Sequence, residues 1–158
     1  MIIPEENIKK FLAIYKPEQR VLKNANLDYP KIHGDFLIGR TYYTLSPLKH
    51  ATDIEIQLCL NQLAYVGLAE TIRLSLDPLF KDIIFEDLQK EGMYIIESKK
   101  RFKKRISPNK YIAGDMTIKS KIQRRGIILL NADFQFENNS CFGNLELVIL
   151  NRETKESK

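Results

Sequence analysis

The first pattern along the chain is helical. In residues 4–15, PEENIKKFLAIY, apolar and aromatic positions recur every three or four residues, after a proline and two glutamates. Proline and acidic side chains are favoured in the first turn of a helix, where backbone N–H groups lack carbonyl partners. The stretch therefore predicts a short N-terminal helix whose buried face carries Ile8, Phe11, Leu12 and Tyr15.

Strand patterns follow. Residues 16–30 are polar and have no regular period, whereas residues 36–46, FLIGRTYYTLS, are rich in aromatic and β-branched side chains. Such side chains favour strands, and the proline at position 47 ends the run. Residues 53–60 alternate polar and apolar positions, as a half-buried strand does. The sequence therefore predicts two strands, over 36–46 and 53–60.

The period changes at Asn61. From there the apolar and aromatic positions Tyr65, Leu68 and Ile72 follow at spacings of four, three and four. This is the period of a helix, which we expect to begin near Asn61 and to end before Pro78. On its flank the small residues 64 and 67, an alanine and a glycine, suit close packing against a sheet.

Four strand-like runs complete the pattern. They cover residues 93–104, 110–122, 126–136 and 141–150. The sequences between them, SPN, QRRG and ENNS, suit turns and tight hairpins. The order of elements is helix, strand, strand, long helix and four closely connected strands. This order predicts an α+β domain in which an antiparallel sheet wraps one long helix.

Composition fits a single globular domain. The chain has 158 residues, 44% of them hydrophobic and 28% charged, which suits one sizeable core. We expect one domain over residues 1–150 and a flexible tail over 151–158. No run is long and apolar enough for a membrane span or a signal peptide. A cytoplasmic location without membrane contact is expected.

Familiar catalytic and cofactor motifs are missing from the sequence. It contains no GxSxG elbow, Walker loop or GxGxxG, and its two histidines are not at metal-ligand spacing. Cys59 and Cys141 lie in apolar stretches without a CxxC spacing. They predict buried thiols rather than a metal site or a disulfide; a nucleophilic pair of Cys59 with His50 is the alternative. We expect no metal and no cofactor.

Positive charge gathers in one short run. The net charge is +5, and KKRFKKR at residues 99–105 places six basic side chains around one phenylalanine. Such a run can bind nucleic acid, the phosphates of a coenzyme or carrier, or an acidic protein surface; the alternative is a solvated strand face. A single aromatic side chain offers little base stacking, and no recognition motif accompanies it. A nucleic-acid partner is therefore not expected.

Asn61 stands where the predicted strand becomes the predicted helix. Its side chain can cap the first turn. Alternatively, the free N–H groups of the helix start can polarise a carbonyl or bind an anion, with Asn61 as an added donor. Asp53 and Glu55 share one face of the predicted strand, and His50 precedes it in a loop. For these three residues solvent exposure is the alternative to a catalytic role.

Two stretches resemble the FcoT-like acyl-thioesterases, a branch of the hot-dog fold. The first, FLIGRTYYTLSPLKHATDIEIQLCLNQLAYVGLA, resembles the family's F-x-I-G, a tyrosine, a histidine and V-E-x-x-x-C-x-N-Q-L-x-Y. The second, MYIIESKKRFKKRISPNKY, resembles M-x-I-x-x-x-x-x-R-F-x-K-x-x-x-P-x-K. The likeness extends over about residues 15–150. The matching residues are Phe36, Ile38, Gly39, Tyr43, His50, Glu55, Cys59, Asn61, Gln62, Leu63, Tyr65, Met93, Ile95, Arg101, Phe102, Lys104, Pro108 and Lys110.

The resemblance implies a hot-dog domain and a homodimer with acyl tunnels at the subunit interface. It also implies an enzyme of fatty-acid or secondary lipid metabolism. The substrate would be an acyl thioester of coenzyme A, or of the phosphopantetheine arm of an acyl carrier protein. The basic run would then attract the phosphates or the acidic carrier.

The resemblance also places site residues. The family's pocket has two tyrosines and two asparagines; three of these positions fall on Tyr15, Tyr43 and Asn61, and the other asparagine falls on Thr52. A hydroxyl offers one donor where an amide offers two, so Thr52 would hold a water or substrate group differently. We expect Tyr43, Asn61 and the N–H groups after Asn61 to bind the thioester carbonyl. Thr52, Glu55 and Tyr15 would line the reacting centre.

Other residues are expected to contact the substrate without taking part in the reaction. The candidates near the helix are close in sequence to the matched motif, and the remainder belong to the basic run. They are His50, Asp53, Tyr65, Lys99, Arg101, Lys103 and Lys104.

Three functions remain open at this point. The first is thioester hydrolysis. In the second, similar proteins of isonitrile-lipopeptide pathways add the amino group of glycine to C3 of a 2-enoyl thioester on a carrier protein. Both reactions develop negative charge on the thioester oxygen, but addition needs a base, for which Glu55, Asp53 and His50 are candidates. The third is acyl or carrier binding without catalysis.

Overall fold

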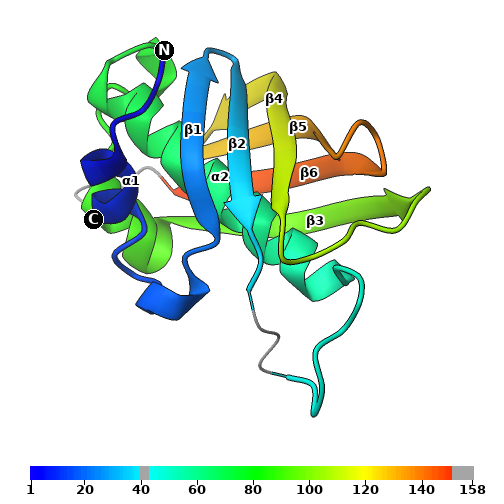
Figure 1. The fold of residues 1–158 in the computed structure, drawn as a ribbon. Helices are drawn as coiled ribbons and strands as arrows, with labels where there is room; N and C mark the ends of the chain where they lie inside the picture. The colour runs from blue at the N-terminus through cyan, green and yellow to red at the C-terminus, as the bar shows by residue number, and fades with distance from the viewer. Residues whose placement is uncertain (40–42, 151–158) are drawn as a thin grey trace.

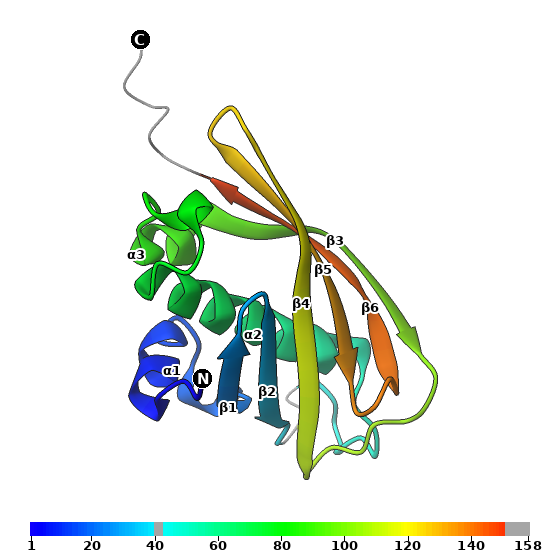
Figure 2. The same cartoon turned by 90° about the horizontal axis from the view of Figure 1, so that it is seen from above.

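A six-stranded antiparallel sheet curls around one long helix (Figures 1 and 2). The computed structural model describes residues 1–39 and 43–150. The strands lie in the order β1-β2-β4-β5-β6-β3, so β1 and β3 form the edges of the sheet. The strands are β1 Leu22–Asp28, β2 Lys31–Leu37, β3 Met93–Phe102, β4 Tyr111–Arg124, β5 Ile127–Phe136 and β6 Cys141–Leu150. The predicted α+β architecture is confirmed.

The helices differ greatly in length. The central helix is α2, Asp53–Arg73, and a short helix, α1, Glu5–Phe11, packs near β1. The segment between α2 and β3 holds a 3-10 turn, Pro78–Phe80, a short helix, α3, Phe85–Asp87, and a π-helical turn, Leu88–Gly92. A further 3-10 turn covers Pro17–Gln19. Among the described residues, no helix has the length and apolar character that crossing a membrane requires.

The predicted boundary between a strand and a helix at Asn61 is wrong. Residues 53–60 belong to α2, which begins at Asp53, with Thr52 as its N-cap. The alternation there does not mark a strand, because α2 is enclosed on most sides and buries polar residues such as Glu55 and Gln62 together with apolar ones. Polarity therefore does not identify the exposed face of this helix.

The sequence pattern also predicts the N-terminal strands at the wrong positions. Of the strand predicted over 36–46, only Phe36 and Leu37 lie in β2; residues 43–46 form bends, and residues 40–42 are outside the described chain. The structure instead has β1 within the stretch expected to be irregular. That segment, LKNANLD, is poor in strand-forming residues and is held by pairing with β2.

The C-terminal half follows the sequence pattern closely. Strands β3 to β6 match the four predicted runs to within a few residues. The QRRG turn places Arg125 and Gly126 at φ values of 46° and 76°. Two consecutive left-handed residues are what a tight hairpin between twisted strands requires, and glycine adopts this conformation without strain.

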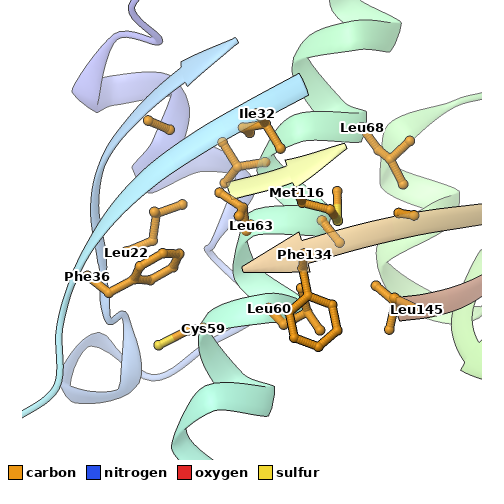
Figure 3. Close-up of a cluster of buried hydrophobic side chains, with 14 of the residues drawn as sticks. Leu22, Ile32, Phe36, Cys59, Leu60, Leu63, Leu68, Met116, Phe134 and Leu145 are labelled. Atoms are coloured by element: carbon orange, nitrogen blue, oxygen red, sulfur yellow. The ribbon is translucent and has the colours of Figure 1, made fainter. Parts of the chain in front are cut away.

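The core lies between α2 and the concave face of the sheet. Figure 3 shows Leu60, Leu63 and Leu68 of α2 among side chains from the strands. Gly67 allows close approach, since a Cβ there would lie 3.0 Å from the end of Ile32 in β2. The small residues of α2 thus have the packing role that the sequence predicts.

A buried carboxylate joins three segments at the far end of α2. Asp77 accepts hydrogen bonds from the Tyr29 hydroxyl and from Lys121 in β4, and from the Leu79 N–H at 2.9 Å. Burial by itself would raise the pKa of Asp77, but the hydrogen bonds from Lys121 and Tyr29 hold it below its usual range. The chain after α2 is thereby tied to the β1–β2 turn and to β4.

Candidate active site

Three polar side chains meet at the N-terminus of α2, and we call them the Glu55 cluster: Tyr43, Thr52 and Glu55. Thr52 and Glu55 form a capping box. Glu55 Oε2 accepts the Thr52 N–H at 2.6 Å and the Thr52 hydroxyl at 2.9 Å. The Tyr43 hydroxyl lies 2.6 Å from Thr52 Oγ1. Because Thr52 donates to the carboxylate, Tyr43 is the donor to Thr52, and the three groups form a chain of hydrogen bonds.

Glu55 is the most unusual member of this cluster. Its side chain is buried, with the residue 6% exposed, although it belongs to the first turn of a helix. Its second oxygen, Oε1, has no hydrogen-bond partner among the described residues. Nearly all buried polar atoms in proteins have a partner, which is often a bound water or ligand. This oxygen is therefore able to accept a hydrogen bond from a bound water or substrate.

Protonation of the neighbouring groups is set by burial and by Glu55. Burial raises the pKa of Tyr43, and the nearby Glu55 carboxylate raises it further, while the hydrogen bond with Thr52 acts in the opposite direction. Tyr43 is therefore a protonated donor at neutral pH. Burial, with Glu55 adding to it, also raises the pKa of the Cys59 thiol. The alternative of a Cys59–His50 nucleophile is wrong, because Cys59 is wholly buried and His50 lies on an exposed loop.

Asn61 lies elsewhere than the sequence predicts. It is in the middle of α2 rather than at its start, so the N–H groups after Asn61 belong to the helix interior and bond to carbonyls of the preceding turn. They cannot bind a substrate carbonyl. The amides of the first turn, next to Thr52, are the ones that lack helical partners.

A second polar group surrounds Asn61, and we call it the Asn61 cluster: Gln57, Asn61, Ser98 and Lys100. The Gln57 Nε2 donates to Asn61 Oδ1 at 2.9 Å. The Gln57 Oε1 accepts from the Ser98 hydroxyl at 3.1 Å and from the Lys100 ammonium. The cluster thus links α2 to the inward face of β3.

An apolar cavity adjoins the Asn61 cluster. It has a volume of about 170 Å³ and lies between α2 and the β3–β6 pair. Asn61 is the polar residue in a lining that is otherwise apolar or aromatic. The lining residues are Asn61, Ala64, Tyr65, Met93, Tyr94, Ile95 and Leu147. An amide in the wall of an apolar cavity suits the polar head of a molecule with an apolar chain.

The Glu55 cluster and the Asn61 cluster lie on different sides of α2. Glu55 and Asn61 are six residues apart, which at 1.5 Å and 100° per residue is about 9 Å along the axis and about 120° around it. Their side chains therefore diverge. One chain by itself does not bring Glu55 and Asn61 to the same atom.

The match to a known family covers nearly the whole of this arrangement. The model of the FcoT-like thioesterase domain matches residues 10–149. The chain belongs to this family. No curated protein matches the sequence.

Solved structures show the same hot-dog fold at low identity. A thioesterase from Haemophilus influenzae has a TM-score of 0.58 and 13% identity, with 98% of this chain and 96% of that one covered. A virulence protein from Campylobacter jejuni has a TM-score of 0.55 and 12% identity, with 98% and 96% covered. A thioesterase superfamily protein from Shewanella loihica has a TM-score of 0.51 and 6% identity, with 80% and 89% covered. The hot-dog fold implied by the sequence motifs is confirmed.

Two tyrosines of this FcoT-like domain pack together beside the cavity. The rings of Tyr15 and Tyr65 meet edge to face, with centroids 6.3 Å apart, and Tyr65 lines the cavity. Burial raises the pKa of both tyrosines. Tyr15 therefore lies on the side of the Asn61 cluster, apart from Thr52 and Glu55, with which the sequence grouped it.

The other predicted site residues near the start of α2, Asp53 and His50, also lie in different places. Asp53 is 67% exposed and lies 3.2 Å from the Lys100 ammonium, so it belongs beside the Asn61 cluster. His50 is exposed on the loop before α2, as expected. Gln62, which the family motif also matched, anchors the start of β1: its Oε1 accepts from the Val21 and Leu22 N–H groups at 3.0 and 3.1 Å.

The basic run divides between the two faces of β3. Lys99 and Arg101 point outward, where Lys99 pairs with Glu97 at 3.0 Å. Lys103 lies 4.9 Å above the Phe142 ring, and Lys104 is exposed. Lys100 points inward to the Asn61 cluster and was not among the predicted site residues. The period of two along β3 could have singled it out, since it lies between two outward residues.

In the described ranges 1–39 and 43–150, no three or more His, Cys, Asp or Glu side chains lie together so that they could hold a metal ion.

Proposed function

We propose that this protein hydrolyses fatty acyl thioesters carried by coenzyme A or by the phosphopantetheine arm of an acyl carrier protein. The observation that supports this most directly is the buried oxygen of Glu55, which lacks a partner next to Thr52 and Tyr43. In a chain of the FcoT-like thioesterase family, such a carboxylate is suited to activate a water.

In this proposal Glu55 is the general base. A water that donates to Oε1 satisfies the buried oxygen and is held for attack on the thioester carbonyl carbon. Oε2 remains fixed by the N–H and hydroxyl of Thr52, at 2.6 and 2.9 Å. As the water attacks, its proton passes to Glu55. When the C–S bond breaks, the thiolate takes this proton from Glu55 and leaves as the free thiol, which restores the carboxylate. Tyr43 keeps Thr52 oriented as a donor to the carboxylate.

Asn61 is the donor to the thioester oxygen. Its Nδ2 group has no acceptor among the described residues, while its Oδ1 is occupied by Gln57. An amide N–H that faces the developing oxyanion stabilises it in the transition state. The apolar cavity beside Asn61 would hold the acyl chain.

A second copy of the chain would complete the site, because Glu55 and Asn61 of one chain diverge. The edge strand β3 pairs with β6 alone among the described strands, so its outer edge is open to pairing. On α2, Ile54, Leu58 and Tyr65 are partly or largely exposed at helical spacing around Asn61. A homodimer that buries this stripe would bring Asn61 of one subunit toward the Glu55 cluster of the other.

The exposed part of the basic run suits the carrier of the acyl chain. Lys99, Arg101, Lys103 and Lys104 form a positive surface on and after β3. Such a surface attracts the phosphates of coenzyme A or an acidic carrier protein. We propose that these four side chains bind the carrier rather than the reacting group.

Glycine addition to a 2-enoyl thioester is the second candidate, and Thr52 is the observation that favours it. The resemblance to the family's motifs implies an asparagine at this position in its thioesterases, whereas here a hydroxyl donates to Glu55. In this reaction Glu55 would deprotonate the glycine ammonium, the amino nitrogen would bond to C3, and C2 would receive a proton.

Mass spectrometry separates these functions. The protein is incubated with saturated and 2-enoyl thioesters, on coenzyme A and on carrier protein, with and without glycine. Free acid and free thiol from the saturated thioester support hydrolysis. A thioester heavier by one glycine, formed from the enoyl substrate alone, supports addition. Tight binding of acylated carrier without either product would overturn both in favour of a binding protein.

A Glu55→Gln variant tests the assignment of the base. Gln keeps the shape and the acceptor oxygen for Thr52 but cannot take a proton, so the rate should fall by roughly 10²–10⁴-fold. The thermal unfolding midpoint, measured in parallel, should change little. Full activity in this variant would show that another group is the base.

A further inference from the structure

We infer that Lys100 and Gln57 are positioning residues that hold the Asn61 amide with its NH₂ group toward the cavity. The catalytic importance of this orientation rests on the proposed function. The orientation itself follows from the hydrogen bonds of the Asn61 cluster. It gives a role to the inward-facing lysine of the basic run.

Lys100 has no hydrogen left to offer a substrate. Its side chain is only 9% exposed, which is unusual for lysine. The ammonium has three N–H donors. The ammonium donates hydrogen bonds to Gln57 Oε1 and to Ser98 Oγ at 3.0 Å, and it forms an ion pair with the Asp53 carboxylate at 3.2 Å. Lys100 can therefore affect bound substrate only through a neighbour.

That neighbour is Gln57, whose amide orientation is fixed by the charge. An ammonium donates and never accepts, so the atom of Gln57 that faces Lys100 must be the oxygen. Ser98 donates to the same oxygen at 3.1 Å. The Gln57 NH₂ group is therefore turned toward Asn61 and donates to its Oδ1 at 2.9 Å.

The same reasoning fixes Asn61. Because Oδ1 accepts from Gln57, the NH₂ group must point the other way. No residue in the described part of the chain accepts from it, and Asn61 lines the apolar cavity. Without Lys100, the two amides could both rotate by 180° and present Oδ1, an acceptor that repels a thioester oxygen. The positive charge of Lys100 thus causes Asn61 to present its NH₂ group, and not Oδ1, to the cavity.

The first test compares Lys100→Met with Gln57→Glu, using the acyl thioester that the wild type hydrolyses. In Gln57→Glu the new carboxylate still accepts from Lys100 but cannot donate to Asn61, so the Asn61 amide should rotate. We expect kcat to fall about tenfold or more in both variants, as for a lost oxyanion donor, with KM within about twofold. The matched control is Lys119→Met, a lysine on β4 whose nearest carboxylate partner, Asp133, is 3.8 Å away; its kcat should be unchanged.

A double-mutant cycle separates positioning from general stabilisation. In an Asn61→Ala background there is no amide to orient, so adding Lys100→Met should lower kcat no further. If Lys100→Met lowers kcat by the same factor with and without Asn61, the lysine acts independently and the inference is overturned.

The third measurement needs no activity, so failure of the proposed function and of this inference can be told apart. The side-chain NH₂ resonances of Gln57 and Asn61 are assigned by NMR in the wild type and in Lys100→Met. Loss of the lysine should shift both pairs of resonances, because each NH₂ group then changes its hydrogen-bond partner. Resonances of Asn61 that do not move would overturn the inference even in an active enzyme.

Discussion

At the scale of single residues, Thr52 has two tasks that are hard to separate. It is the N-cap of α2, and its hydroxyl links Tyr43 to Glu55. Threonine and asparagine are both good N-caps. Exchanging threonine for asparagine at position 52 should therefore affect the candidate site more than the stability of α2.

A Thr52→Asn variant tests this separation. The amide oxygen can accept from Tyr43, and the NH₂ group can donate to Glu55 with one hydrogen to spare for a bound water. We expect hydrolysis of a saturated thioester to rise about tenfold, or about 1.4 kcal/mol in the barrier, with unfolding free energy within about 0.5 kcal/mol. Steady-state kinetics and urea denaturation check the two. A fall in rate would show that the hydroxyl itself is needed.

At the scale of elements, the contact between β3 and β6 positions the Asn61 cluster. Gly143 of β6 faces Lys100 across the pair. A Cβ at Gly143 would lie 1.7 Å from the Lys99 carbonyl oxygen, which is backbone and cannot swing aside. The inward turn of Lys100 thus depends on a glycine in the neighbouring strand.

We expect Gly143→Ala to destabilise the fold by about 3 kcal/mol, the upper range for overpacking, because β3 must move away from β6. Urea denaturation measures the loss. Gly39→Ala is the matched control, since nothing lies within 4 Å of a Cβ there. Equal stability of the two variants would mean that β3 is not held in this close contact.

At the scale of the whole molecule, Asp77 joins segments far apart in the sequence. Its pKa is lowered in the folded state relative to the ordinary 3.8, so it stabilises the fold above that pH. The contribution is lost as the pH falls through 3.8 toward the lower folded pKa. In Asp77→Asn this part of the pH dependence should disappear. Urea midpoints between pH 6 and pH 3 test it, and parallel curves for wild type and variant would contradict it.

Assembly is the other property at this scale. Ile54 is 59% exposed on the stripe of α2 that surrounds Asn61. Ile54→Lys should convert the proposed dimer to a monomer and abolish hydrolysis together with it. Sedimentation velocity and activity are measured on the same samples. Ile84→Lys is the control, because Ile84 is 61% exposed before α3, away from this stripe, and the dimer should persist.

Some parts of the fold and of the candidate site are determined by interactions between residues close in the sequence, and these parts can be predicted from the sequence alone. Strands β3 to β6 and α1 follow from local period and turn residues, and the family motifs give the hot-dog fold. The motifs also pick out Tyr43, Thr52, Glu55 and Asn61. In each case the signal lies in residues close together in the chain, so one sequence is enough to see it.

Only the tertiary structure decided how these residues are grouped. The start of α2 at Asp53 was hidden, because a helix enclosed on most sides has no polar face to reveal its period. That start places Glu55 with Tyr43 and Thr52, and turns Asn61 to another side of the helix. Lys100 reaches Gln57 from a strand 43 residues later. Such contacts depend on the packing of distant segments, which no local pattern of hydrophobic and polar residues records.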